Sequence, residues 1–349
     1  MNGHESIWKS ALRSFLKAIV SMFGILIGLI AISAVFNSDT SRFAAYGLKM
    51  AVVPTERNSN TMYDPTLPYF LQISIDDVIG MQNGIASEDV DRMLRYAIKA
   101  PLNVNNLKGI ILNINSPGGT VTDSDSIYRA LKAFRQKQNV PVFAYVNGIC
   151  ASGAYYIACA AEQIFTSPIS IIGSVGVLTG PFFNVEGLAS KYGVKAVTLS
   201  MGKDKEAFPF LEKLPDNYEN LPSLNGWKTC MGAMYAIFVD IVVAARTAQG
   251  ITKEKLTGEY GAQIFPPDLA HKYGYIDNGN ATYFDCVSAL VKKSDLADDA
   301  NFQIITFNEN AWTLRSFLSM RLMTWLEMVT FGSQARYLGC NDKFFYILE

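Results

Sequence analysis

The fold of this chain is decided by the stretch PVFAYVNGICASGAYYIACAA, which covers residues 141–161. Its first part, PVFAYVNG, is a short apolar run of the kind that forms a buried strand. Its second part begins at Ser152 and continues through Gly153 into an apolar, proline-free segment that favours a helix. The stretch therefore predicts a strand that passes directly into a helix, with Ser152 at the junction.

The same strand–helix alternation continues on both sides of this stretch. Further strands are predicted at YFLQISID (69–76), GIILNIN (109–115), QIFTS (163–167) and KAVTLS (195–200). Helices are predicted at 87–100, with Ser87 as its cap, at 124–138, and across most of 217–248, where Pro222 and Gly226 are expected to interrupt the pattern. Such alternation indicates an α/β domain with a largely parallel sheet.

Residues 18–37, AIVSMFGILIGLIAISAVFN, contain no charged side chain. A helix of this length rises about 30 Å, which matches the hydrocarbon core of a bilayer. Lys9, Arg13 and Lys17 precede the segment and favour an N-terminus on the cytoplasmic side. We therefore expect an uncleaved single-pass anchor in the inner (cytoplasmic) membrane, with the bulk of the chain on the extracytoplasmic side. A cleaved signal peptide is the alternative.

Composition excludes several classes of function. The chain of 349 residues is 50% hydrophobic and carries a net charge of −1, so its overall charge does not attract nucleic acid. It has no run of lysine and arginine and no zinc-type cysteine spacing, so we expect no metal and no cofactor. Its five scattered cysteines are expected to be buried free thiols, including Cys150, which lies two residues before Ser152.

Two segments follow predicted strands closely enough to form a site. Parallel-sheet folds place ligands beyond the carboxyl ends of their strands. SPGG (116–119) follows one strand, and its two glycines allow a sharp turn that exposes backbone N–H groups to a developing oxyanion. Ser152 follows the next strand at a helix N-terminus, where negative charge is favoured. Taken separately, an ordinary turn and a plain helix cap are the better explanations of these features, and only their combination favours a site.

A serine nucleophile needs a base, and the sequence offers two histidines. His4 precedes the predicted anchor and lies across the membrane from the domain, and His271 is expected on a surface helix. A lysine performs the same task where burial or nearby cations lower its pKa. The residue content therefore favours a Ser–Lys pair.

Four separated motifs resemble those of peptidase family S49, in the same order and spacing. They are SPGG, ASGAYYIA (151–158), GSVGV (173–177) and SMGKDKEAFPF (200–210), and the resemblance extends from about Tyr69 to Asp277. The chain is similar to a short, single-copy signal peptide peptidase A, also called protease IV. This resemblance implies a Clp/crotonase-type fold and a membrane-anchored serine endopeptidase.

The resemblance also implies a role for individual residues. Ser152 matches the family nucleophile, and Ser174 matches the serine that hydrogen-bonds the catalytic lysine. Gly119 and Gly153 match the positions whose backbone N–H groups form the oxyanion hole. Lys205 matches the general base.

Lys203 is the alternative to Lys205, because the spacing from Gly202 to Pro209 differs by one residue from the usual pattern. The family implies cleavage of leftover signal peptides and other membrane-released peptides. It also implies a ring-like homo-oligomer in which one copy's lysine completes another's site. A Clp-type or crotonase-type enzyme and a catalytically silent membrane scaffold are the competing interpretations.

The predicted organisation has five parts: a cytoplasmic tail (1–17), the anchor (18–37), a spacer (38–67), the protease domain (68–300) and a C-terminal helical tail (301–349). Within that tail, residues 311–331 are apolar but include two arginines and a glutamate. We expect this segment to pack on its own domain or a neighbouring subunit, or to lie in the membrane interface.

Overall fold

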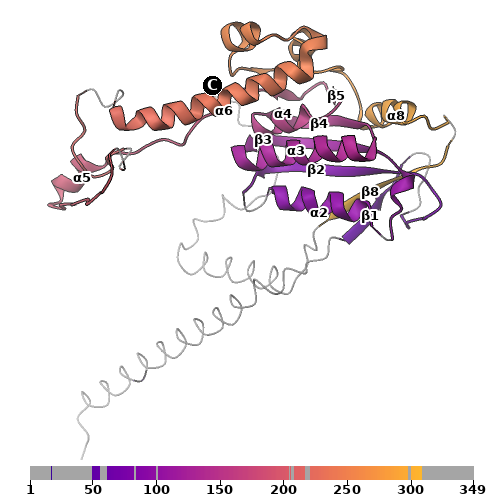
Figure 1. The fold of residues 1–349 in the computed structure, drawn as a ribbon, viewed down its shortest axis with the longest axis horizontal. Coiled ribbons are helices and arrows are strands. Elements are labelled where there is room, and N and C mark those ends of the chain that lie inside the picture. The colour runs from indigo at the N-terminus through magenta and orange to yellow at the C-terminus, as the bar shows by residue number, and fades with distance from the viewer. Residues whose placement is uncertain are drawn as a thin grey trace, which may run out of the picture. The chain divides into compact units, whose positions relative to one another are not determined.

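A computed structural model describes one compact unit, Met50–Phe307, in most of its detail (Figure 1). The residues described are 17, 49–55, 61–81, 84–99, 101–203, 205, 208–216, 221–297 and 300–308. The predicted anchor at 18–37 and the apolar tail segment at 311–331 lie outside the described residues. Both therefore stay predictions.

Eight strands form one sheet in the order β1-β8-β2-β3-β4-β6-β7, with β5 also pairing with β4. The strands are β1 Lys49–Val53, β2 Tyr69–Ile79, β3 Leu107–Gly119, β4 Val142–Ala151, β5 Gln163–Thr166, β6 Ile171–Gly173, β7 Ile264–Phe265 and β8 Gln303–Asn308. The central pairs β2–β3, β3–β4, β4–β5, β4–β6 and β2–β8 are parallel, and β6–β7 is antiparallel. The predicted α/β fold with a largely parallel sheet is confirmed.

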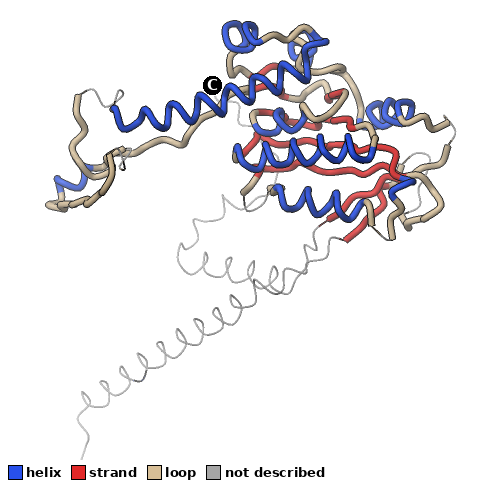
Figure 2. The backbone as a smooth tube through the Cα atoms, viewed as in Figure 1, coloured by secondary structure: helices blue, strands red, loops and turns tan. Residues whose placement is uncertain are grey.

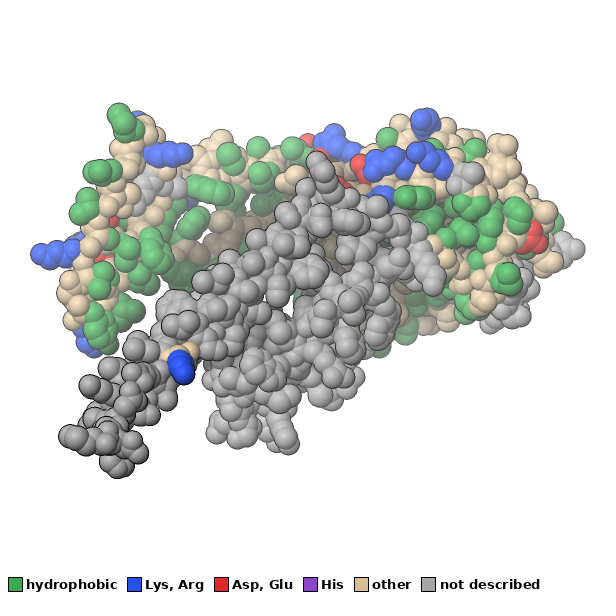
Figure 3. Space-filling model, turned by 90° about the horizontal axis from the view of Figure 1, so that it is seen from below, with side chains coloured by type: hydrophobic (Ala, Val, Ile, Leu, Met, Phe, Trp, Pro, Cys, Tyr) green, Lys and Arg blue, Asp and Glu red, His purple; other side chains and the backbone are tan. Residues whose placement is uncertain are grey.

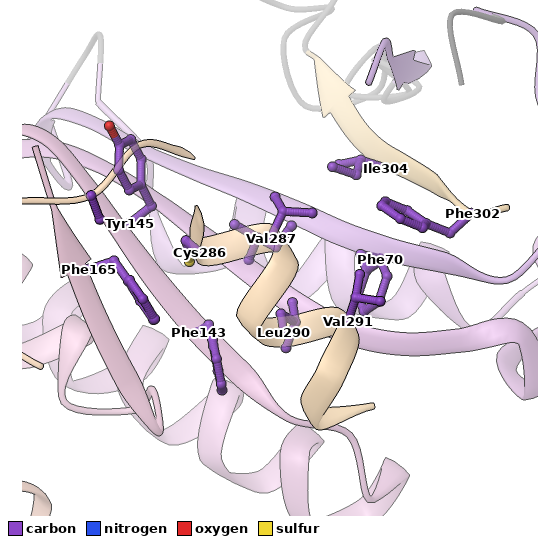
Figure 4. Close-up of a cluster of buried hydrophobic side chains, with 12 residues drawn as sticks. Phe70, Phe143, Tyr145, Phe165, Cys286, Val287, Leu290, Val291, Phe302 and Ile304 are labelled. Carbon is purple, nitrogen blue, oxygen red and sulfur yellow. The ribbon is translucent and has the colours of Figure 1, made fainter. Parts of the chain in front are cut away.

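Helices cover both faces of the sheet (Figures 1 and 2). They are α2 Ser87–Ala97, α3 Val121–Gln138, α4 Gly153–Ala158, α5 Glu186–Lys191, α6 Asn225–Arg246, α7 Pro267–Lys272 and α8 Tyr283–Lys293. On one face, α2, α3 and α4 lie next to one another. On the other face, α8 packs Leu290 and Val291 against Phe70 and other strand residues (Figure 4).

The central strands are apolar on both sides because helices bury both sides. Phe70 faces α8, while its neighbours Leu71 and Ile73 are also fully buried, at 0% exposure. Strands buried on both faces have near-continuous apolar sequences without strict alternation. YFLQISID and GIILNIN therefore identified two adjacent central strands.

The start of α3, next to the SPGG segment, is pinned by hydrogen bonds. The Thr120 hydroxyl caps the helix by accepting from Asp123 N at 3.2 Å. The Asp123 carboxylate in turn accepts from the backbone N and the hydroxyl of Ser87, at 3.0 and 2.9 Å. Ser87 is thus the first residue of α2 and ties it to α3. The predicted capping role of Ser87 is wrong, because Ala86 occupies the cap position.

Several local predictions differ from the structure. SPGG continues strand β3 to Gly119 instead of turning, because it remains paired with β2 there. KAVTLS forms no strand among the described residues, and Gly226 lies inside α6 without interrupting it. β1 and β8 join the sheet from the predicted spacer and tail, so the compact unit extends beyond residues 68–300 on both sides.

Helix α6 and its extension are unusually apolar for a surface segment. Within the described part of the chain, Asn225–Gln249 is the one helix long and apolar enough to cross a membrane, with a mean hydropathy of 1.6. Only 17% of its most apolar window is buried within the chain. Its C-terminal end is fixed to the domain, because Arg246 is 1% exposed and pairs with Asp277 at 2.8 Å.

Candidate active site

Ser152 lies between the end of β4 and the start of α4, as predicted, but in a strained conformation. Its φ and ψ are 52° and −123°, a region that residues with a Cβ rarely occupy. Such a conformation costs about 1–3 kcal/mol and concentrates at functional sites. Although Ser152 holds the cap position of α4, its side chain makes no capping hydrogen bond. The plain helix-cap explanation for Ser152 is therefore wrong.

The backbone on either side of Ser152 is held by its neighbours. Ser152 N donates to Gly173 O at 2.9 Å, and Ala151 is paired with Gly173 where β4 meets β6. Ser174 follows at once, with a φ of 55° and its N–H donating to Gln263 O at 2.8 Å. The structure thus brings the backbones of the two predicted site serines side by side.

The SPGG segment touches the same junction, backbone against backbone. Gly118 has a φ of 102°, and a Cβ at this position would lie 2.7 Å from Gly153 N. A Cβ on Gly153 would lie 3.3 Å from Gly119 N and 2.2 Å from the Ser124 hydroxyl oxygen. Only glycine allows this approach. The two residues predicted to supply oxyanion N–H groups are therefore neighbours, and Gly153 N–H, at the first position of α4, has no acceptor within the helix.

Lys205 is not part of this arrangement. It lies in the segment of residues 178–216, which we call the arm and which contains α5. The Lys205 side chain is exposed, its backbone N–H donates to Gly202 O at 3.3 Å, and it does not line the cavity at Ser152. One end of α6 lies near α4, and Figure 1 shows α5 beyond the opposite end of α6. Lys203 is exposed on the same arm, so one chain brings neither lysine to Ser152.

The arm holds its own shape but is poorly covered. Its internal contacts include Asn184 Nδ2 donating to Pro209 O at 2.6 Å and Phe182 stacking on Phe208. Its apolar side chains nonetheless face solvent in this chain, as Figure 3 shows. Leu199 and Met201 are each 94% exposed, and Val197 is 85% exposed. Among the described residues, no strand lies beside KAVTLS for it to pair with, which explains why the predicted strand does not form.

A small cavity of about 30 Å³ adjoins Ser152. It is lined by Gly119, Val121, Ser124, Ser152, Gly153, Tyr156, Gly176, Val177, Met234 and Phe238. Apart from two serines and the backbone of three glycines, its walls are apolar or aromatic. The side chains come from α3, α4 and α6, from Ser152 just before α4, and from Val177 in the segment after β6.

Tyr156 is a site residue that motif reasoning missed. It follows Ser152 by four residues, so the two residues lie on the same face of the helix that begins there. This spacing is the sequence feature that could have identified Tyr156 as a neighbour of Ser152. Its hydroxyl donates to Asp125, which also pairs with Arg129 at 2.6 Å. Burial, and then the Asp125 contact, raise the pKa of the Tyr156 phenol. Burial alone would raise the pKa of Asp125, but the hydrogen bonds from Arg129 and Tyr156 outweigh it and leave that pKa lowered.

Cys150 and His271 do not line the Ser152 cavity. Cys150 is fully buried in β4, and burial raises the pKa of its thiol well above the ordinary value. His271 is exposed on α7 and does not line the Ser152 cavity. Cys159 and Cys286 are also buried free thiols, as expected, whereas Cys230 is exposed.

The sheet, with a strained serine at the end of a central parallel strand, defines a Clp-protease-type fold. The model of the Clp protease family matches residues 79–176, and that of peptidase family S49 matches residues 134–296. The chain is thus similar to peptidase family S49, and relatives named signal peptide peptidase SppA, SohB and protease 4 support the signal peptide peptidase A type.

Individual relatives and one solved structure show how far the similarity extends. An inferred protease from Methanocaldococcus jannaschii is 28% identical over 66% of this chain and 70% of its own length. An inferred signal peptide peptidase SppA from Enterococcus faecium is 27% identical over 63% of this chain and 60% of its own, which is less than two thirds of that relative. Among solved structures, a ClpP1 variant from Listeria monocytogenes matches 61% of this chain and 92% of its own, at 16% identity and a TM-score of 0.39.

Proposed function

We propose that this protein is a membrane-anchored serine endopeptidase with a Ser–Lys dyad, in which Ser152 is the nucleophile and Lys205 the general base. The observation that carries the proposal is the Ser152 geometry: a strained φ of 52° and a hydroxyl that is not used for capping. A strained residue at a helix N-terminus beside exposed glycine backbone is the arrangement expected of an activated nucleophile. Similarity to family S49 over residues 134–296 supports the same chemistry.

In the proposed mechanism, the Ser152 hydroxyl oxygen attacks the peptide carbonyl while the Lys205 amine accepts its proton. The carbonyl oxygen becomes an oxyanion, and the N–H groups of Gly119 and Gly153 donate to it. Lys205 then returns the proton to the departing amine, and water releases the acyl group by the reverse sequence. Ser174 donates or accepts a hydrogen bond that aims the lysine amine.

The base is supplied by the arm of a second copy in a homo-oligomer. Two observations support this part of the proposal. Lys205 is exposed and does not line the Ser152 cavity of its own chain. The arm also exposes apolar side chains, such as Leu199 and Met201 at 94%, which association would bury.

The proposed substrates are leftover signal peptides and other membrane-associated peptides. The uncharged segment at 18–37 would anchor the chain in the inner membrane, with the catalytic domain on the extracytoplasmic side. An anchored protease is concentrated at the surface where such peptides are released. The apolar walls of the Ser152 cavity suit apolar peptides.

Mixing two inactive variants tests the dyad and the assembly together. Ser152→Ala and Lys205→Ala should each be inactive, while Lys203→Ala keeps most of its activity. Co-expressing the two inactive forms should restore about a quarter of wild-type activity, because half of the serines and half of the neighbouring lysines are intact. Activity in purified Lys205→Ala would refute the base. A co-expressed mixture that stays inactive would refute the supply of the lysine by another copy.

A further inference from the structure

On the premise that the proposed function is correct, the cavity at Ser152 indicates which side chain a substrate peptide can have at the cleaved bond. Gly119 and Gly153, whose N–H groups are proposed to hold the carbonyl oxygen, line this cavity together with Ser152. A carbonyl placed between these groups belongs to the residue on the acyl side of the cleaved bond. The cavity therefore receives the side chain of that residue, which we call the acyl residue.

The space available to the acyl residue is small. The cavity measures about 30 Å³. It is far smaller than the roughly 300–1,000 Å³ of ordinary ligand pockets. That space is suited to the methyl group of alanine. A leucine or phenylalanine side chain would have to displace one of the walls.

The inner wall is fixed in place. Tyr156 is 5% exposed, and its hydroxyl is held by Asp125. One side of its ring meets Tyr128 edge-on, with centroids 5.4 Å apart. Its ring also contacts that of Phe238, with centroids 5.0 Å apart. Tyr156 therefore has no free direction in which to move away from a larger side chain.

The wall formed by Phe238 is equally restrained. Phe238 is 3% exposed and lies on α6, next to the buried Val239. Two turns further along the helix, Arg246 is fully enclosed and bonds to both Asp277 and Gly274 O. Moving Phe238 outward would disturb this anchored end of α6. Met234, one turn earlier, is 41% exposed and closes the rim.

We propose that this cavity limits the acyl residue to small side chains of about the size of alanine, and that Phe238 sets the limit. Phe238 is thus a specificity-determining residue, and it acts by filling space that a larger acyl side chain would need. One methylene too many in a restrained apolar pocket changes kcat/KM by about 10–200-fold. Wild-type enzyme should therefore prefer alanine to leucine by at least about tenfold.

The test uses the full-length enzyme and four fluorogenic peptides that differ only in the acyl residue: alanine, valine, leucine or phenylalanine. Phe238→Ala should raise the leucine-to-alanine ratio of kcat/KM by at least about tenfold. Met234→Ala should raise the same ratio by a smaller factor without removing a buried side chain, so the test does not depend on Phe238→Ala folding. Ile237→Ala is the matched control, since Ile237 is 46% exposed on the same helix and lies outside the cavity.

Each result has a defined meaning. A wild-type enzyme that cleaves the leucine or phenylalanine peptide as well as the alanine peptide overturns the size limit and leaves the proposed function standing. An unchanged ratio in folded Phe238→Ala and in Met234→Ala overturns the assignment to this cavity. An enzyme inactive on all four peptides overturns the proposed function, and with it the size limit.

Discussion

The strand ends around Ser152 and the arm that carries Lys205 are built in opposite ways. Around Ser152, backbone packs on backbone, and neighbouring residues such as Cys150 and Ala154 are 0% exposed. On the arm, Val197, Leu199 and Met201 are 85–94% exposed. The backbone around Ser152 is held by packing within one chain, whereas the segment that bears the proposed base is largely exposed.

The backbone around Ser152 and the backbone of the arm are therefore positioned by different kinds of contact. Strain at Ser152 persists because the surrounding sheet and glycines determine its backbone from several sides. The arm has internal contacts, such as Val185 N donating to Phe210 O at 2.9 Å, but few that tie it to the sheet. Under our proposal, association of two copies supplies the missing contacts. Substitutions should therefore affect the two regions differently.

The largest expected effect is at Ser152 itself. Ser152→Ala should lower kcat by about 10⁴-fold or more without changing the fold, because the nucleophile is removed and the Cβ is kept. Ser152→Gly should be equally inactive but more stable by about 1 kcal/mol, because glycine tolerates the positive φ. Peptide hydrolysis and urea unfolding measure the two effects. A folded Ser152→Ala enzyme with near wild-type activity would refute the nucleophile.

A pair of glycine substitutions compares the two regions directly. Gly118→Ala should destabilise the protein by roughly 2–4 kcal/mol and abolish activity, because its Cβ would meet Gly153 N and the Ser152 Cβ at 2.7 and 2.9 Å. Gly187→Ala, on α5 with no atom within 4 Å of the new Cβ, should change stability by less than about 1 kcal/mol. The free energy of unfolding is read from urea titrations. Equal effects at both positions would contradict the contrast between a packed junction and an open arm.

The smallest expected effect is a pH dependence at the start of α3. Hydrogen bonds from the Thr120 hydroxyl and from Ser87 N–H hold the pKa of Asp123 below its ordinary value. This carboxylate therefore adds stability above about pH 3.9, and the contribution is lost as the pH falls through the lowered pKa. Asp123→Asn should be less stable by about 0.3–1 kcal/mol near neutrality, because a carboxylate in the first turn of a helix is stabilising, and the difference from wild type should shrink in acid.

Urea unfolding of both proteins near neutrality and near pH 3 measures this loss. Asp91→Asn is the control, because Asp91 makes one exposed ion pair, to Arg95 at 3.8 Å, and should have almost no effect. A difference between wild type and Asp123→Asn that persists unchanged in acid would assign the effect to packing and not to charge.

Local sequence determined the central strands, the strand-to-helix junction at Ser152 and the resemblance to family S49. These predictions succeeded because a strand buried on both faces needs a continuous apolar run, and a backbone approach like that at Gly118 excludes a side chain. The failed predictions were at segments whose state depends on a partner. KAVTLS has the composition of a strand, but strand structure requires a neighbour to pair with.

Tertiary structure alone decided which residues surround the serine and how the sheet is completed. Tyr156, Asp125 and Phe238 come from three helices, and nothing in their separate sequence contexts marks them as neighbours. β8 lies beside β2 although more than two hundred residues separate them, because pairing in a sheet depends on long-range packing. The unusual backbone angles of Ser152 were likewise invisible in its sequence. These angles result from the contacts that β6 and the Gly118–Gly119 backbone make around Ser152. Only the folded chain brings these segments together.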